Sequence, residues 1–114
     1  MKIKYVIALA LSLLVAGCDN APKFDGSSPE ALRYSGEKVL ESLSDEKKTE
    51  LKAAISDALS YYATQAMLSN DTAYSPDKMR LTVLNGKTAD EVISDAKSYR
   101  EKKEKIIKEY RQKN

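Results

Sequence analysis

Four polar signals divide the chain after residue 27 into segments that favour helices. Each signal begins with a serine or threonine, which suits a helix N-cap, and an aspartate or glutamate follows within two residues. The N-cap candidates are Ser28, Ser44, Ser75 and Thr88. Glu91 stands three residues after Thr88, which is the capping-box pattern. A chain divided in this way is constrained to a series of helices joined by turns.

Apolar residues recur at helical spacing after three of these signals. The three stripes are Leu32, Val39, Leu40 and Leu43; Leu51, Ala54, Ile55, Ala58, Leu59, Tyr62 and Ala66; and Val92, Ile93, Ala96, Tyr99, Ile106, Ile107 and Tyr110. Gly36 lies where a close neighbour can approach the first helix. The pattern predicts a small all-α bundle of three or four helices, with a modest core.

Residues 76–84 fit two structures. Pro76 and Asp77 follow a serine, as at a helix start, but Met79, Leu81 and Val83 alternate with polar residues, as in a strand. A lone strand has no partner elsewhere in the chain. We therefore favour a helix, preceded by a loop at 69–72 and ended by Asn85 and Gly86.

Residues 1–17 have the layout of a secretory signal peptide. Lys2 and Lys4 precede an apolar run of roughly ten residues, whereas a membrane-spanning helix needs about 20. Small residues then precede Cys18, and the block resembles a bacterial lipobox. That resemblance implies cleavage before Cys18, a diacylglyceryl group on its thiol, and a further acyl chain such as palmitate on its amine. The alternative is a cytosolic thiol in a buried N-terminal helix.

Asp19 and Asn20 resemble the signal that keeps enterobacterial lipoproteins in the inner membrane. We expect a protein anchored by lipid on the periplasmic face of the inner membrane, or in the outer membrane where this sorting rule does not apply. Residues 19–28 are polar and rich in turn formers, which predicts a tether. The expected organisation is a signal peptide at 1–17, the lipidated cysteine and tether at 18–28, and a helical domain at 29–114.

Charge and chemistry exclude several classes of function. Removing Lys2 and Lys4 leaves 17 basic residues against 17 acidic ones, so a nucleic-acid partner is not expected. The chain has no histidine and one cysteine, and it lacks a phosphate loop and a nucleophile elbow. We expect no enzyme, no cofactor and no metal. The acidic residues at 45–46 and 90–91 suit first helical turns, and we expect Asp57 and Asp95 to face solvent.

Two surface features have both a functional and a structural interpretation. Residues 97–114 carry eight basic and three acidic side chains. They could contact anionic lipid headgroups, but we favour a solvated helix end with i,i+4 pairs from Glu101 to Lys105 and from Glu104 to Lys108. Tyr61 and Tyr62 point about 100° apart on a helix. Both cannot lie at the centre of the core, so they are candidates for an interface.

The motifs FDGSS at 24–28, ESLSDE at 41–46 and LNGKTADEVI at 84–93 resemble a family of small proteobacterial lipoproteins of unknown function. Some enterobacterial members are inner-membrane lipoproteins tied to envelope stress. The resemblance implies no catalytic residue, and it leaves the role of the basic C-terminal helix open.

We expect a lipid-anchored interaction protein that binds another envelope protein. One alternative is an inhibitor or immunity protein against a periplasmic toxin or hydrolase. A second is a carrier of a lipid or small ligand, which the small core disfavours because it can enclose little.

Overall fold

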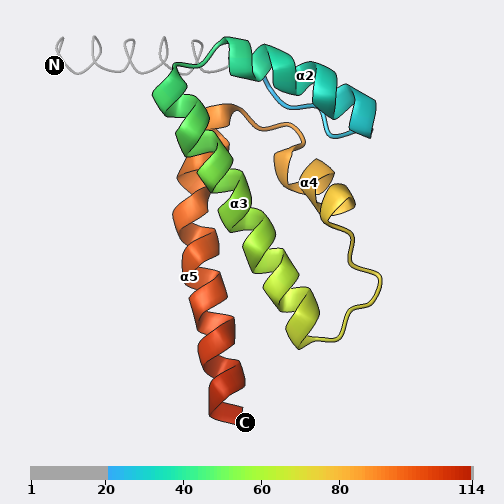
Figure 1. Ribbon diagram of the computed structural model, residues 1–114, viewed down its shortest axis with the longest axis vertical. Coiled ribbons are helices and arrows are strands. Elements are labelled where there is room, and N and C mark those ends of the chain that lie inside the picture. The colour runs from blue at the N-terminus through green and yellow to red at the C-terminus, as the bar shows by residue number, and fades with distance from the viewer. Residues whose placement is uncertain (1–20, 114) are drawn as a thin grey trace, which may run out of the picture.

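The computed structural model describes residues 21–113, and Cys18, Asp19 and Asn20 lie outside them. The described part contains four helices, labelled as in Figure 1: α2 (Pro29–Glu41), α3 (Asp45–Leu68), α4 (Pro76–Leu84) and α5 (Ala89–Lys113). The predicted all-α bundle is confirmed. Over the same residues, no helix is long and apolar enough to cross a membrane.

Each of the four predicted caps is made. The side chains of Ser28, Ser44 and Ser75 accept hydrogen bonds from backbone amides at the start of α2, α3 and α4. At α5 the capping box is reciprocal: the Thr88 amide donates to Glu91 Oε1 at 3.0 Å, and the Glu91 amide donates to Thr88 Oγ1 at 3.2 Å. The Thr88 amide also holds the pKa of the Glu91 carboxyl below its usual value.

Residues 76–84 are helical, so the strand alternative is wrong for this segment. The Ser75 cap and the proline at the first helical position favour the helix locally. Val83 and Leu84 are buried, whereas Met79 is half-buried, so the apolar residues reach the core from one helix face. Gly86 ends the element with a φ of 77°, a left-handed value that glycine adopts without strain.

The two long helices, α3 and α5, run parallel to each other (Figure 1). Three side-chain contacts between them share one sequence separation of 43 residues: Lys47 to Asp90, Asp57 to Arg100, and Ser60 to Lys103. A constant difference in residue number means that both helices advance in the same direction with a fixed register. The connection through α4 returns the chain to the starting end, which parallel pairing requires.

The core lies where the N-terminal halves of α3 and α5 meet α2 and α4. Leu51 of α3 and Val39 of α2 are its most deeply buried large side chains. Ala54, Ala58 and Ala96 are buried between the long helices, where small side chains allow close approach. Most residues of the three predicted stripes contribute to this core. Tyr110, at the end of the third stripe, is 47% exposed, so the core does not extend to the last turns of α5.

Candidate functional site

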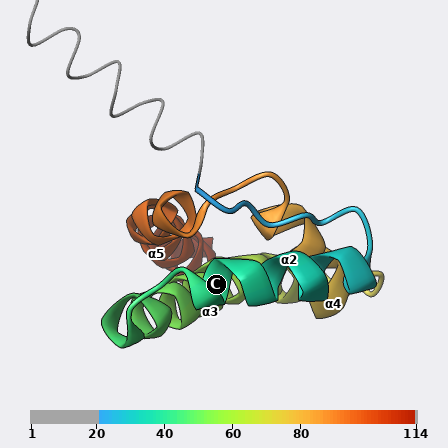
Figure 2. The ribbon, with the colours of Figure 1, turned by 90° about the horizontal axis from the view of Figure 1, so that it is seen from above.

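The segment before α2 packs on the domain, in contrast to the predicted tether. The Phe24 amide donates to Lys87 O at 2.9 Å, and the Gly86 amide donates to Phe24 O at 2.8 Å. Next, the amides of Asp25 and Gly26 donate to Ser35 Oγ and Asn85 Oδ1. Figure 2 shows this segment running between α2 and the turn that follows α4. We call residues 23–28 the N-terminal clasp.

Phe24 is the apolar anchor of the clasp. Its side chain is 5% exposed and belongs to the core, and its ring edge lies near Gly36, where a Cβ atom would be 3.8 Å from Phe24 Cε1. The expected close neighbour of Gly36 is thus this ring. The tether prediction is corrected for residues 23–28, because one large buried side chain outweighs the polar composition around it.

The two candidate interface tyrosines form an aromatic cluster with Tyr99 of α5. The Tyr61 ring centroid lies 5.0 Å from that of Tyr62 and 5.9 Å from that of Tyr99. The Lys102 ammonium lies 5.5 Å from the Tyr99 ring centroid. Neither Tyr61 nor Tyr62 is fully buried, in keeping with their diverging directions on α3. Their faces toward α5 are occupied, so a partner would meet only their outer edges.

The pKa of Tyr99 is raised to about 12 by burial, with a further contribution from its hydrogen bond with Tyr62. An unfolded tyrosine has a pKa near 10. Between these pH values the folded state holds the proton more tightly, so the free energy of unfolding falls as the pH rises from about 10 to about 12. In a pH titration followed by tyrosinate absorbance, we expect the parent protein to show a step near pH 12 that the Tyr99→Phe variant lacks. If the step that the variant lacks were instead near pH 10, the assignment to Tyr99 would be wrong.

Two carboxylates expected to face solvent are instead half-buried and paired. Asp57 accepts from Arg100 Nη1 at 2.7 Å across the α3–α5 interface, and Asp95 pairs with Lys87. Both partners come from elsewhere in the fold, so local sequence does not reveal them. Among residues 21–113, no group of three or more acidic or cysteine side chains is arranged to hold a metal ion.

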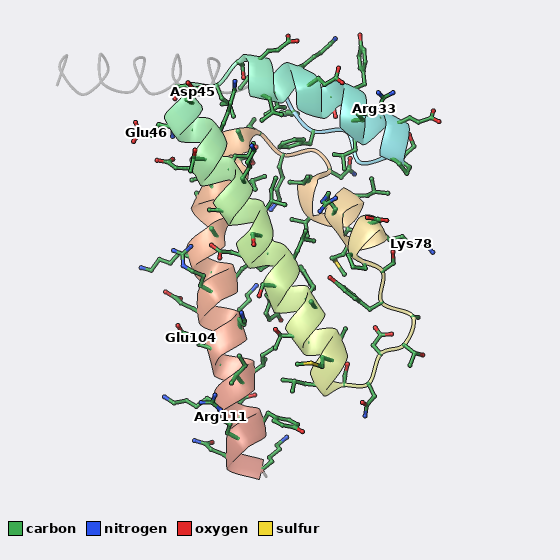
Figure 3. All side chains as sticks on the ribbon, viewed as in Figure 1. Arg33, Asp45, Glu46, Lys78, Glu104 and Arg111 are labelled. Carbon is green, nitrogen blue, oxygen red and sulfur yellow. The ribbon has the colours of Figure 1, made fainter. Side chains whose placement is uncertain are left out.

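The C-terminal half of α5 is basic and largely exposed. Within the described residues its one ion pair along the helix joins Lys97 to Glu101 at 3.9 Å, so the predicted pairs of Glu101 and Glu104 with later lysines are not formed. Lys103 instead donates to Ser60 of α3 at 2.7 Å. Glu104 and Arg111 project from α5 on the side away from α3 (Figure 3). Part of the positive charge therefore holds the two long helices together.

Apolar side chains are exposed where α3 and α5 end. Met67 is 70% exposed. A hollow of about 230 Å³ between the ends of the two helices is lined in part by Leu68, Ile106 and Tyr110. We call this region the distal end. Met67 was not predicted as a surface residue of interest, although its place outside the apolar stripe of α3 was an available signal.

A larger groove, of about 830 Å³, lies between α3, α4 and the end of α2. Its α3 wall includes Ile55, Leu59 and Ala63, and its opposite wall includes Tyr74 and Arg80. Its volume lies within the range of small-molecule sites, about 300–1,000 Å³. This groove could not be predicted from the sequence, because its walls come from helices that are distant along the chain.

These features define a small all-α protein with a parallel pair of long helices, whose N-terminal segment is clasped onto α2 and the turn between α4 and α5. The chain belongs to a family of unknown function, DUF6694, whose sequence model matches residues 4–101. No curated protein and no solved structure matches the chain. The match ends within α5, so the most basic part of that helix lies outside it.

Proposed function

We propose that this chain is a lipid-anchored protein of the bacterial cell envelope that acts by binding another envelope protein. The signal-peptide pattern and the residues around Cys18 support the anchor. The observation that carries the proposal is the N-terminal clasp, because it ties the domain to a point a few residues after Cys18. Asp19 and Asn20 support the periplasmic face of the inner membrane, or the outer membrane where the sorting rule does not apply.

A short link between the lipid and the fold follows from the clasp. Lys23 forms a backbone bridge with Thr88, directly before α5. Lys23 stands five positions after Cys18, a length of at most about 18 Å when the chain is extended. A free tether of ten residues would span about 35 Å. A lipid on Cys18 would thus hold the end of the domain that contains the starts of α3 and α5 close to the bilayer.

Such a short anchor favours association with a partner in the same membrane. Confinement raises the effective concentration of the two proteins, so a weak interface suffices. The distal end supplies exposed apolar surface for that interface, with Met67 as its most exposed large apolar side chain. The outer edges of Tyr61 and Tyr62 remain a second candidate surface on α3.

We expect Cys18→Ala to release the chain from the membrane fraction and to abolish crosslinking to its envelope partner in cells. The variant lacks the acyl chains, each of which contributes about 0.8 kcal/mol per buried methylene. The measurement is fractionation of tagged chain, followed by in-cell crosslinking and identification of the captured protein. The helical circular dichroism spectrum is expected to be unchanged, because Cys18 lies before the described fold.

Asp19→Ser is the matched control, because it keeps the cysteine. We expect this variant to stay membrane-bound and to move from the inner to the outer membrane. Cys18→Ala protein that stays in the membrane fraction would overturn the anchor. Full complementation of a deletion by the released protein would overturn the requirement for membrane confinement.

A further inference from the structure

The α3 wall of the groove between α3 and α4 carries a narrow apolar row. Ile55, Leu59 and Ala63 stand four residues apart on α3, so they form a single row along one helix face. Leu40 of α2 and Pro76 of α4 extend the apolar lining. From Lys52 to Ala63 the α3 wall is about 16 Å long at 1.5 Å per residue. One row of this length fits one alkyl chain, whereas a bound helix needs a wider apolar face.

Two cations border this row without a carboxylate partner. Lys52 of α3 and Arg80 of α4 are exposed and line the groove, and no acidic residue of the described chain, 21–113, lines it. Within the described residues neither side chain forms an ion pair, whereas Lys47, Lys87 and Arg100 each have a carboxylate. The groove is therefore apolar along its α3 row and positively charged at its border.

A third wall residue has an unused polar group. The Tyr74 hydroxyl is buried and has no hydrogen-bond partner among the described residues. A buried polar group left in this state is destabilising, so a ligand that pairs with it gains affinity. Tyr74 lines the same groove, where Ser56 adds a further hydroxyl; Ser60 also lines it, but its Oγ already accepts from Lys103. These groups are suited to an acceptor-rich ligand.

We propose that the groove binds a single-chain anionic amphiphile, a long-chain fatty acid, with its alkyl chain along the α3 row and its carboxylate near Lys52 and Arg80. The occupant lies in an open groove, so the small size of the core does not prevent binding. This site goes beyond the proposed function and does not depend on lipidation of Cys18.

The test is photolabelling of the full-length chain with a long-chain fatty acid that carries a diazirine, in the cell fraction that contains the chain. Mass spectrometry of the labelled peptides is expected to place the adducts within residues 52–63 and 74–80. The double variant Lys52→Glu and Arg80→Glu is expected to lower this labelling about tenfold, a loss that corresponds to 1.4 kcal/mol. Both side chains are exposed, so the fold is expected to persist, which circular dichroism checks.

The double variant Lys105→Glu and Lys108→Glu is the matched control. It makes the same change in charge on α5, away from the groove, and is expected to keep the labelling. A diazirine fatty alcohol, which lacks the anionic group, is expected to label the groove about tenfold less. Equal labelling by the alcohol, or labelling that the Lys52 and Arg80 changes do not reduce, would overturn the proposal. The proposal would also be overturned if a photoreactive residue placed at position 63 crosslinked a protein instead of a lipid.

Discussion

Replacing Phe24 with alanine is expected to lower the free energy of unfolding by about 3–5 kcal/mol. The Phe24 side chain is 5% exposed and packs against the core beside Gly36 of α2. Losing it removes buried apolar area and leaves a cavity at the point where the clasp meets the domain. Because small domains have only about 5–15 kcal/mol of stability, this is a large share. Equilibrium urea denaturation followed by circular dichroism measures it.

Tyr34→Ala is the matched control for this substitution. Tyr34 is also aromatic and lies on α2, but it is 64% exposed. We expect its loss to cost less than about 1 kcal/mol, as for most surface substitutions. If residues 19–28 were a free tether, Phe24→Ala would also be nearly neutral. Similar small effects for both variants would therefore contradict the clasp.

The second large effect is expected at Gly26, where alanine should destabilise the domain by about 1–3 kcal/mol through overpacking. A Cβ atom on Gly26 would overlap the backbone oxygen of Leu81 and lie 2.7 Å from Asn85 Cβ. The backbone of α4 cannot move aside cheaply, so the clasp has to shift. This shift would also break the hydrogen bond from the Gly26 amide to Asn85 Oδ1.

Gly36→Ala is the control, and its expected effect has the opposite sign. The nearest atom to a Cβ there is Phe24 Cε1 at 3.8 Å, an ordinary contact distance. Alanine in a helix interior is favoured over glycine by about 1 kcal/mol. Thermal denaturation of the two variants should thus move the midpoint in opposite directions. A Gly26→Ala variant as stable as the parent protein would show that the clasp is not packed against α4.

The helices could be predicted from the sequence because their signals are local. Ser28, Ser44, Ser75 and Thr88 each cap within a few residues, and the apolar stripes follow the helical period. Residues 76–84 were ambiguous because periodicity in nine residues is a weak signal. There the cap and the proline, rather than the alternation, matched the structure.

The clasp and the groove could not be predicted, because both depend on packing between distant segments. Phe24 is the only phenylalanine in the chain and stands in a polar stretch. This large apolar residue was the one feature of the sequence that did not fit a free tether. From the sequence alone Asp57 is predicted to face solvent, because its partner Arg100 comes from α5, which is distant along the chain. Lys52 and Arg80 likewise share a groove only once α4 is placed against α3.

The parallel pairing of α3 and α5 has a consequence for how fast the chain folds. Three of its polar side-chain contacts each join residues 43 apart, so the pair cannot form outward from a tight turn. The intervening loop and α4 have to be ordered before or together with these contacts, and their ordering entropy opposes the first of them. Helical proteins with mostly local contacts fold fastest. We therefore expect this domain to reach its native state more slowly than an up-and-down bundle of the same length.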